Sequence, residues 1–483
     1  MDLLSVDKIL VIALHKLGDN LQVTPIFKVL KAHYPTAAIH VLTEQRFAFP
    51  FLYNPLISQC HYFDRTRYSN GVITDPGQGK KEICPVILSL REEKFDLLIN
   101  RQSSIEGAIL ASLIGAKEIR GLFMGSDRRT DIQDLFTRLL FAFLPHHRFS
   151  NPYNFVDYAI NIAGQWSGER KLDLCFEEAP GRVALEQLAG LLPDKPVVAC
   201  QPGSLSARRQ WGVANFSRAL LLLLERSSAQ VLLLGSKEEG ALLRGLKLSL
   251  PAHLQNRIFD TSARVSLDTL PGVLARCACL VTNDTGTMHM AAAVGCPVIA
   301  LYFGESFVHE TGPYGANHIV VAADMDCLPC PPGASCSRDE TCKSRMTPEM
   351  VTHLILGRLG LASLKQPENF FTGVRVLTSG ETVKQGEIRY FPLLPVPATQ
   401  HDINRYTYAL TIKRFLREDV SGLTEQLADE MRRGFTDMAE KINGPVDLNM
   451  APLQAFSRTR EEMEGLTEAL KESFFELRSR MVP

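Results

Sequence analysis

Apolar runs and segments of helical period alternate along the first three quarters of the chain. Residues 8–14 form a continuous apolar run with β-branched members, which predicts a strand buried on both faces. A turn at Gly18-Asp19-Asn20 follows, and residues 21–34 have helical spacing, with Pro25 tolerable in the first turn. Residues 38–42 are again strand-like. This order of strand, turn, helix and strand predicts a βαβ unit.

The same order recurs in a second series. We expect strands at residues 95–99, 196–200, 230–234, 279–282 and 297–302, and helices at residues 104–114, 215–226, 238–248 and 288–294. Glycine and proline are frequent between residues 167 and 195, which indicates a domain boundary there. We therefore predict two Rossmann-like α/β domains, residues 1–180 and 190–361. Their strands should carry ligands at the carboxyl ends, which would face a cleft between the domains.

The pattern changes in residues 362–483. Residues 372–392 predict a short hairpin that turns near Ser379-Gly380. From His401 the chain is polar with helical spacing, and Asn443-Gly444-Pro445 divides it into two helical stretches. We predict a mainly helical extension that serves packing or the formation of a homo-oligomer.

Composition and charge narrow the function classes. The 483 residues include 52 Lys and Arg against 53 Asp and Glu, a net charge of −1 that excludes the usual footprint of a nucleic-acid binder. Binding of any anionic ligand would then depend on the local arrangement of residues rather than on an overall positive charge. The apolar run at residues 9–14 is too short for a signal peptide, and no apolar run reaches about 18 residues. We expect a cytoplasmic protein.

The first candidate site is the turn after the strand at 279–282. Helix N-termini favour phosphate, and Gly286 permits a close approach of backbone while Thr285 adds a hydroxyl. Asp284 could cap the helix or accept a hydrogen bond from a sugar hydroxyl, and His289 lies one turn into the helix. The alternative is an ordinary capped helix with a packed histidine.

The second candidate is the turn that begins with Gln201 and contains Ser204. Arg208 and Arg209 follow it, and guanidinium groups fit phosphate oxygens well. A solvated basic loop is the alternative. The third candidate is Asp19, which follows the first strand and could take a proton from an attacking hydroxyl. Its alternative role is that of a helix N-cap.

Four of the eleven cysteines lie close together in residues 327–342. Four thiolates at short spacing suit a structural, tetrahedral Zn or Fe site, although the longer gaps differ from the commonest zinc-ribbon pattern. Two disulfides or four free thiols are the alternatives. The total number of cysteines is odd and the other seven are scattered along the chain, which favours a reducing compartment. The predicted ligands are Cys327, Cys330, Cys336 and Cys342.

Four stretches together resemble the glycosyltransferase family 9 heptosyltransferases, which add ADP-activated heptose to the inner core of lipopolysaccharide. The stretches are residues 9–25, 201–216, 282–297 and 311–315, and the likeness spans residues 8–361. The resemblance implies a GT-B fold, with the acceptor on the N-terminal domain and the nucleotide-sugar donor on the C-terminal domain.

The resemblance also implies roles for residues. Asp19 matches the proposed general base, and Asp284, Thr285, Gly286 and His289 match the donor-binding motif. Arg209 stands where the family usually has lysine, and Glu238 or Glu239 falls near the acid that contacts the nucleotide. An inverting displacement is implied. No cofactor is expected in catalysis, because no acidic pair is recognised at the diphosphate.

The acceptor stays open at this point. A lipopolysaccharide inner-core acceptor would require peripheral contact with the inner membrane. Relatives with a cysteine-rich segment bind iron there and heptosylate autotransporters, so a protein acceptor is an alternative. A non-catalytic nucleotide-sugar binding or assembly protein is another. An NAD(P) oxidoreductase is disfavoured, because residues 14–18 lack the glycine fingerprint of dinucleotide binding.

Overall fold

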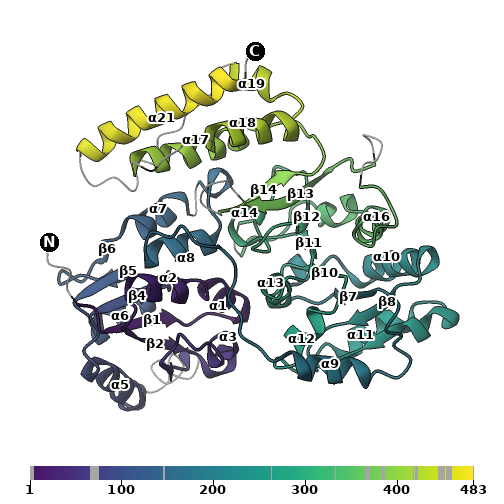
Figure 1. Cartoon of the computed structure of the whole chain (residues 1–483), viewed down its shortest axis with the longest axis horizontal. Coiled ribbons are helices and arrows are strands. Elements are labelled where there is room, and N and C mark those ends of the chain that lie inside the picture. The colour runs from purple at the N-terminus through teal and green to yellow at the C-terminus, as the bar shows by residue number, and fades with distance from the viewer. Residues whose placement is uncertain are drawn as a thin grey trace.

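Two α/β halves and a C-terminal group of helices make up the protein (Figure 1). The computed structural model describes residues 5–481, apart from 66–75, 145–146, 263, 332, 365–369, 382–386, 417, 419–422, 444–451 and 453–459. In Figure 1 the two halves lie next to each other and the last helices lie across the top of both. No helix in the described part of the chain is long and apolar enough to span a membrane.

The N-terminal half is built on a sheet of strand order β3-β2-β1-β4-β5-β6. Its strands are parallel except for β6, which runs antiparallel to β5. The strands are β1 (Lys8–Ala13), β2 (Ala38–Thr43), β3 (Gln59–Tyr62), β4 (Leu97–Asn100), β5 (Glu118–Met124) and β6 (Thr130–Ile132). Five of the six residues of β1 are buried because helices cover both faces of the sheet, which confirms the interpretation of that apolar run.

The helices of this half are α1 (Leu17–Val23), α2 (Ile26–His33), α3 (Phe49–Leu52), α5 (Pro76–Glu92), α6 (Ile105–Ile114), α7 (Leu135–Phe143) and α8 (Phe155–Ala163). The single helix expected at residues 21–34 is wrong. The structure has α1 and α2 instead, and Pro25 stands at the N-cap of α2. Proline has no backbone N–H to continue a helix, so the chain starts a new helix at this point.

The second half has the strand order β14-β13-β12-β11-β10-β7-β8-β9. Strands β7 to β12 are mutually parallel, whereas β13 and β14 add to the edge in antiparallel pairing. The strands are β7 (Val197–Gln201), β8 (Gln230–Leu233), β9 (Ile258–Asp260), β10 (Cys279–Asn283), β11 (Val298–Tyr302), β12 (Ile319–Ala323), β13 (Val374–Glu381) and β14 (Ile388–Pro392).

The helices of the second half are α9 (Glu178–Glu186), α10 (Val213–Arg226), α11 (Gly240–Leu248), α12 (Leu270–Leu274), α13 (Gly286–Ala293), α14 (Val308–Thr311), α15 (Thr341–Arg345) and α16 (Pro348–Arg358). Helix α9 lies inside the expected boundary region and packs on α12. A Cβ on Gly181 would come within 2.3 Å of the Gly272 carbonyl carbon, so only glycine allows this approach. The chain has therefore crossed to the second half by residue 178.

The expected hairpin belongs to the second sheet rather than to the helical extension. Strand β13 pairs with β12 and continues through Ser379 and Gly380, so the turn predicted there is wrong. Residues 382–386, between the two strands, are outside the described residues. Adjacent residues of β13 are buried in different apolar clusters, Val376 in one and Leu377 in the other, so both faces of this strand are covered.

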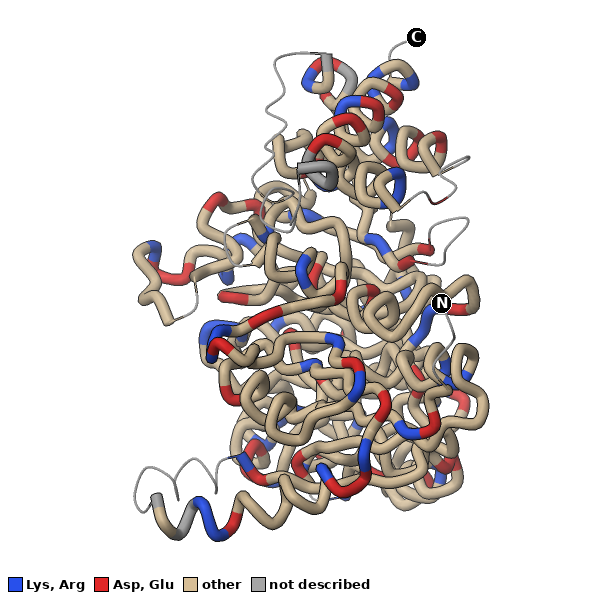
Figure 2. Tube along the Cα trace, turned by 90° about the vertical axis from the view of Figure 1, so that its left-hand side faces the viewer, with Lys and Arg blue, Asp and Glu red and all other residues tan. Residues whose placement is uncertain are grey.

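The C-terminal helices are α17 (Gln400–Phe415), α18 (Leu423–Gly434), α19 (Met438–Asn443) and α21 (Arg460–Met481). They share an apolar core of their own. A second apolar cluster joins Tyr408 and Leu466 of these helices to Phe143 and Tyr158 of the N-terminal half. The break expected at residues 443–445 lies largely outside the described residues. Figure 2 shows acidic and basic residues interspersed along the chain.

Candidate active site

The two halves meet where α1 packs on α13. A Cβ on Gly18 would lie 3.2 Å from the Gly286 Cα and 3.0 Å from the His289 Cδ2. The Gln22 side chain hydrogen-bonds the His289 ring, with 3.2 Å between the two Nε2 atoms. The carboxyl ends of β1 and β10 therefore face each other across this contact, which brings the first and third predicted motifs together.

Asp19 lies in the first turn of α1 and is not its cap. The N-cap of α1 is Lys16, and no side chain bonds the helix end. The Asp19 side chain keeps access to solvent although protein surrounds it, as expected in a cleft. Desolvation raises the pKa of the Asp19 carboxyl, while His289 lowers it and Asp284 raises it. The carboxylate is thus more basic than an exposed aspartate.

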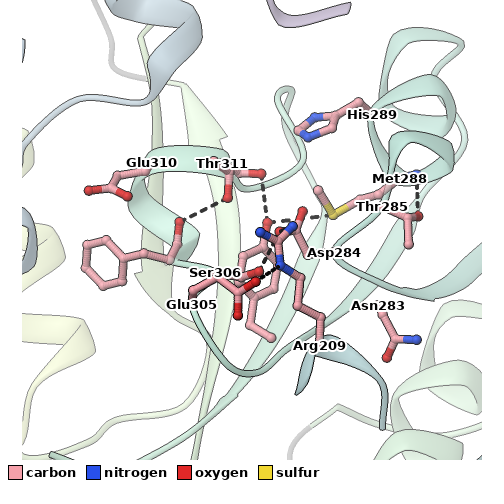
Figure 3. A network of polar contacts seen from close by, with 12 residues as sticks. Arg209, Asn283, Asp284, Thr285, Met288, His289, Glu305, Ser306, Glu310 and Thr311 are labelled. Atoms are coloured by element: carbon pink, nitrogen blue, oxygen red, sulfur yellow. Dashed lines mark hydrogen bonds and ion pairs between the residues drawn. The ribbon is translucent and has the colours of Figure 1, made fainter. Parts of the chain in front are cut away.

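Thr285 caps α13, so the capping role considered for Asp284 is wrong. The Thr285 hydroxyl accepts a hydrogen bond from the Met288 N–H. Asp284 instead accepts from Ser306 Oγ at 2.6 Å and pairs with Arg209 Nη1 at 3.3 Å. Figure 3 shows these side chains converging beside the start of α13. The N-terminus of α13 and the guanidinium group of Arg209 therefore lie next to each other.

Arg209 is held between two carboxylates. Its Nε donates to Glu305 Oε1 at 3.0 Å, in addition to its contact with Asp284. The neighbouring Arg208 donates to the Ala334 carbonyl, which directs it toward the cysteine-rich segment. The two arginines thus have separate surroundings, and Arg209 is the one beside the start of α13.

His289 is buried and uncharged at neutral pH. Desolvation lowers the pKa of its imidazole, against the opposing effect of Asp284 and Asp19. Its Nε2 contacts Gln22, whereas its buried Nδ1 has no hydrogen-bond partner among the described residues. His289 is thus packed at the contact between the halves, as the alternative has it, and its part in binding a donor stays a prediction.

The turn after β7 is shaped around Glu239. A Cβ on Gly203 would come within 1.6 Å of Glu239 Oε1, so the Glu239 carboxylate holds its present place only because residue 203 has no side chain. Glu239 also accepts from the Ser236 N–H at 2.7 Å, and Gln201 lies 3.4 Å from its Oε2. Ser204 lies in the same turn, where its carbonyl accepts from Gln210 at 2.7 Å. Glu238 is exposed, whereas Glu239 is partly buried.

A family model confirms the resemblance. Residues 84–342 match the model of glycosyltransferase family 9 (heptosyltransferase), which is more than half of the chain. This chain belongs to glycosyltransferase family 9. The match ends before β13, so the family model does not extend over the hairpin or the C-terminal helices.

Two curated relatives in the family carry heptosyltransferase names. The chain is 29% identical over 243 residues to lipopolysaccharide heptosyltransferase 1 of Pseudomonas aeruginosa, a match that covers 50% of this chain and 63% of that protein. It is 25% identical over 334 residues to lipooligosaccharide heptosyltransferase 2 of Haemophilus ducreyi, covering 65% of this chain and 88% of that protein. The chain thus matches less than two thirds of the length of the Pseudomonas protein.

Solved structures confirm the α/β fold with two parallel-sheet domains. E. coli ADP-heptose lps heptosyltransferase II aligns with a TM-score of 0.53 at 21% identity, covering 73% of this chain and 98% of that one. A family 9 glycosyltransferase from Veillonella parvula aligns with a TM-score of 0.59 at 21% identity, covering 73% of this chain and 97% of that one.

The geometry does not support the metal site predicted at the cysteines of this family 9 protein. Cys327, Cys330, Cys336 and Cys342 are all free thiols. Among the described residues, no group of three or more His, Cys, Asp or Glu side chains is arranged to hold a metal ion.

Several site residues were missed from the sequence. Glu305 and Ser306 follow β11, and their role depends on strand order, which places β11 beside β10. The acidic pair Asp324 and Asp326 after β12 was also overlooked. Asp324 is paired with Arg375 at 3.0 Å and Asp326 with Arg338 at 2.8 Å. The carboxylates of Asp324 and Asp326 are therefore both already paired with arginine side chains.

Proposed function

We propose that this chain transfers a heptose, or a related sugar, from an ADP-activated donor to a hydroxyl of a lipopolysaccharide inner-core acceptor, with inversion at the anomeric carbon. Family membership supports a glycosyltransferase. One observation carries the mechanism: Gly18 packs so closely on Gly286 that a Cβ on Gly18 would lie 3.2 Å from the Gly286 Cα, which puts Asp19 of one half beside the start of α13 in the other.

The proposed donor site runs along the carboxyl edge of the second sheet. The start of α13 and the Arg209 guanidinium would neutralise the diphosphate, since helix N-termini and arginine forks both favour phosphate. Glu239 rather than Glu238 is the better candidate for the nucleoside, because Glu239 follows β8 and contacts Gln201 at the end of β7, while Glu238 is exposed. Asp284 would accept from a sugar hydroxyl.

Asp19 is the proposed general base. The acceptor oxygen attacks the anomeric carbon, the bond from that carbon to the phosphate oxygen breaks, and ADP departs with the bonding electrons. Asp19 takes the proton of the attacking hydroxyl, and its raised pKa suits this task. Charge that develops on the leaving phosphate is stabilised by Arg209 and by the N–H groups of α13.

The test is turnover with defined substrates. Purified protein is incubated with ADP-heptose, and in parallel with UDP- and GDP-sugars, in the presence of lipopolysaccharide precursor from a heptose-deficient strain. We expect nucleotide release only with the ADP-sugar and only with the acceptor, and a product anomer opposite to that of the donor. Binding of ADP-heptose without transfer would favour the non-catalytic alternative. A protein acceptor, a cytoplasmic location and peripheral membrane contact stay predictions.

A further inference from the structure

A cavity of about 550 Å³ lies between the second sheet and the C-terminal helices. Its floor is formed by residues that follow β11 and β12, including Ser306 and His309. The first residues of α17, His401 to Arg405, form one wall, and Phe149 of the N-terminal half contributes to another. All three regions of the molecule therefore meet around this cavity.

The cavity continues the proposed donor site. Strand order places β8, β7, β10, β11 and β12 side by side, so Glu239, Gln201, Asp284 and Ser306 follow one another along one edge of the sheet. Ser306 lines the cavity and donates to Asp284 at 2.6 Å. A nucleotide-sugar with its nucleoside near Glu239 would point its sugar toward this cavity.

The lining suits a sugar ring. His309 packs edge-on against Tyr390 with 5.8 Å between ring centroids and lies 5.3 Å from the Phe307 ring, while Phe149 stacks on His401 at 5.1 Å. Aromatic faces cover the C–H surfaces of a pyranose, and planar polar groups bond its hydroxyls. The lining guanidiniums and carboxylates balance at three each: Arg375, Arg389 and Arg405 against Asp324, Asp326 and Asp402.

One ring of this lining is free to bond a ligand. The His309 imidazole has aromatic contacts but no hydrogen-bond partner within the described part of the chain. By contrast, Arg375 is engaged by Asp324, Asp402 and the Pro397 carbonyl. The arginines thus hold the wall in place, and His309 supplies an unused donor and acceptor.

We propose that this cavity binds a sugar unit of the acceptor, next to the sugar that carries the attacking hydroxyl. The proposal rests on the proposed function and adds a subsite outside the span of the family model, because its α17 wall begins beyond residue 342. An acceptor that extends from Asp19 past Asp284 would reach this cavity, because Asp284 accepts a hydrogen bond from Ser306, which lines the cavity.

His309→Trp, which fills the cavity, is the main test. With the precursor oligosaccharide, deacylated to be soluble, we expect KM for the acceptor to rise by about tenfold or more while KM for ADP-heptose changes less than about twofold. Ala322→Leu, which adds bulk from β12, should act the same way if the tryptophan variant does not fold. His253→Trp, at an exposed position on the second half, is the matched control.

Binding is also measured without turnover. Saturation-transfer NMR of the same oligosaccharide with full-length protein and ADP should give signals that both cavity variants lose and the control keeps. An unchanged acceptor KM in a folded cavity variant, or a rise in the donor KM instead, overturns the subsite. Failure of the proposed function looks different, because wild-type protein would then release no ADP in any arm.

Discussion

Two of the contacts between the described residues of the two halves are built in opposite ways. The contact beside Asp19 is made by glycine backbone, Gly18 on Gly286, with the side chains of Gln22 and His289 bonded next to it. The contact beneath the C-terminal helices is made of charged groups. Arg148 pairs there with Glu310 through two bonds, of 2.5 and 3.2 Å.

The second contact extends into a buried network. Asp157 of α8 accepts from Tyr314 at 2.6 Å and from Arg170 at 3.2 Å, and burial raises the pKa of this carboxyl to about 6. Asn154 donates to Tyr390 in β14. The difference is instructive: the contact beside Asp19 is close backbone packing at the proposed base, whereas the charged contact fixes the relation of the two halves beside the cavity lined by Phe149, Phe307 and His309. The hairpin and α17 add to the charged contact.

The largest expected effect is at the contact beside Asp19. Asp19→Asn removes the base while keeping the shape of the side chain, and we expect the transfer rate to fall by about 10³-fold. Binding of ADP, measured by calorimetry, should be unchanged because Asp19 belongs to the acceptor side. Asp194→Asn, at an exposed position, is the control. Transfer at the wild-type rate would rule out Asp19 as base.

The variant Arg148→Met breaks the charged contact between Arg148 and Glu310. Glu310 is almost completely buried, so its carboxylate would lose its partner without gaining water. We expect the free energy of unfolding to drop by about 3 kcal/mol, the usual cost of an uncompensated buried charge. Urea denaturation measures it. The double variant Arg148→Met/Glu310→Leu should recover most of the loss, and a loss equal to that of the single variant would contradict this account.

A third prediction concerns pH and the C-terminal helices. Burial raises the pKa of Glu430 in α18 to about 7. Since its pKa is higher in the folded state than the usual 4.5, the ionised form destabilises the fold, and this penalty grows from about pH 4.5 to pH 7. Glu430→Gln should therefore stabilise by roughly 2–3 kcal/mol at pH 8 and by little at pH 4.

Thermal unfolding of this variant at the two pH values checks the third prediction. Glu425→Gln serves as the control, because its side chain is about half exposed in the same helix. Equal stabilisation at both pH values would show that the pKa of Glu430 is not raised.

The smallest expected effect concerns Gly18, at the contact beside Asp19. A methyl group on Gly18 would press on the Gly286 Cα at 3.2 Å, so Gly18→Ala must shift α1 or α13 by a few tenths of an ångström. We expect about a tenfold loss of transfer rate and little change in the free energy of unfolding, since positioning matters more to catalysis than to stability. Gly245→Ala, with open space around it, is the control.

Periodicity predicted most strands and helices of both halves, because parallel strands buried on both faces leave long apolar runs. Periodicity failed where one or two residues, rather than the apolar pattern, determine where an element ends or continues. Pro25 splits a helix whose apolar period continues through it, and Ser379-Gly380 continues a strand although the pair is typical of turns. The antiparallel addition of β13 to β12 is a long-range pairing that no local pattern records.

The candidate site shows the same division. Asp19, Asp284, Thr285 and Arg209 stand next to turns after strands, so local sequence could nominate them. Glu305 and Ser306 could not be nominated, because their meeting with Arg209 and Asp284 depends on β11 lying beside β10. The cysteine spacing predicted metal ligands, yet spacing along a loop does not fix the directions of the thiols.

The hairpin described above bears on how the protein can be shortened or recombined. A chain cut at residue 361, where the likeness to the family stops, would lose β13 and leave the N–H and C=O groups of β12 without their partners. Exposed edges of this kind recruit strands from other molecules. A unit for recombination with another family 9 member therefore includes β13 and β14 through Pro392. The helices beyond Pro392 belong to the same unit, because Lys413 of α17 pairs with the buried Glu387 next to β14 at 2.8 Å.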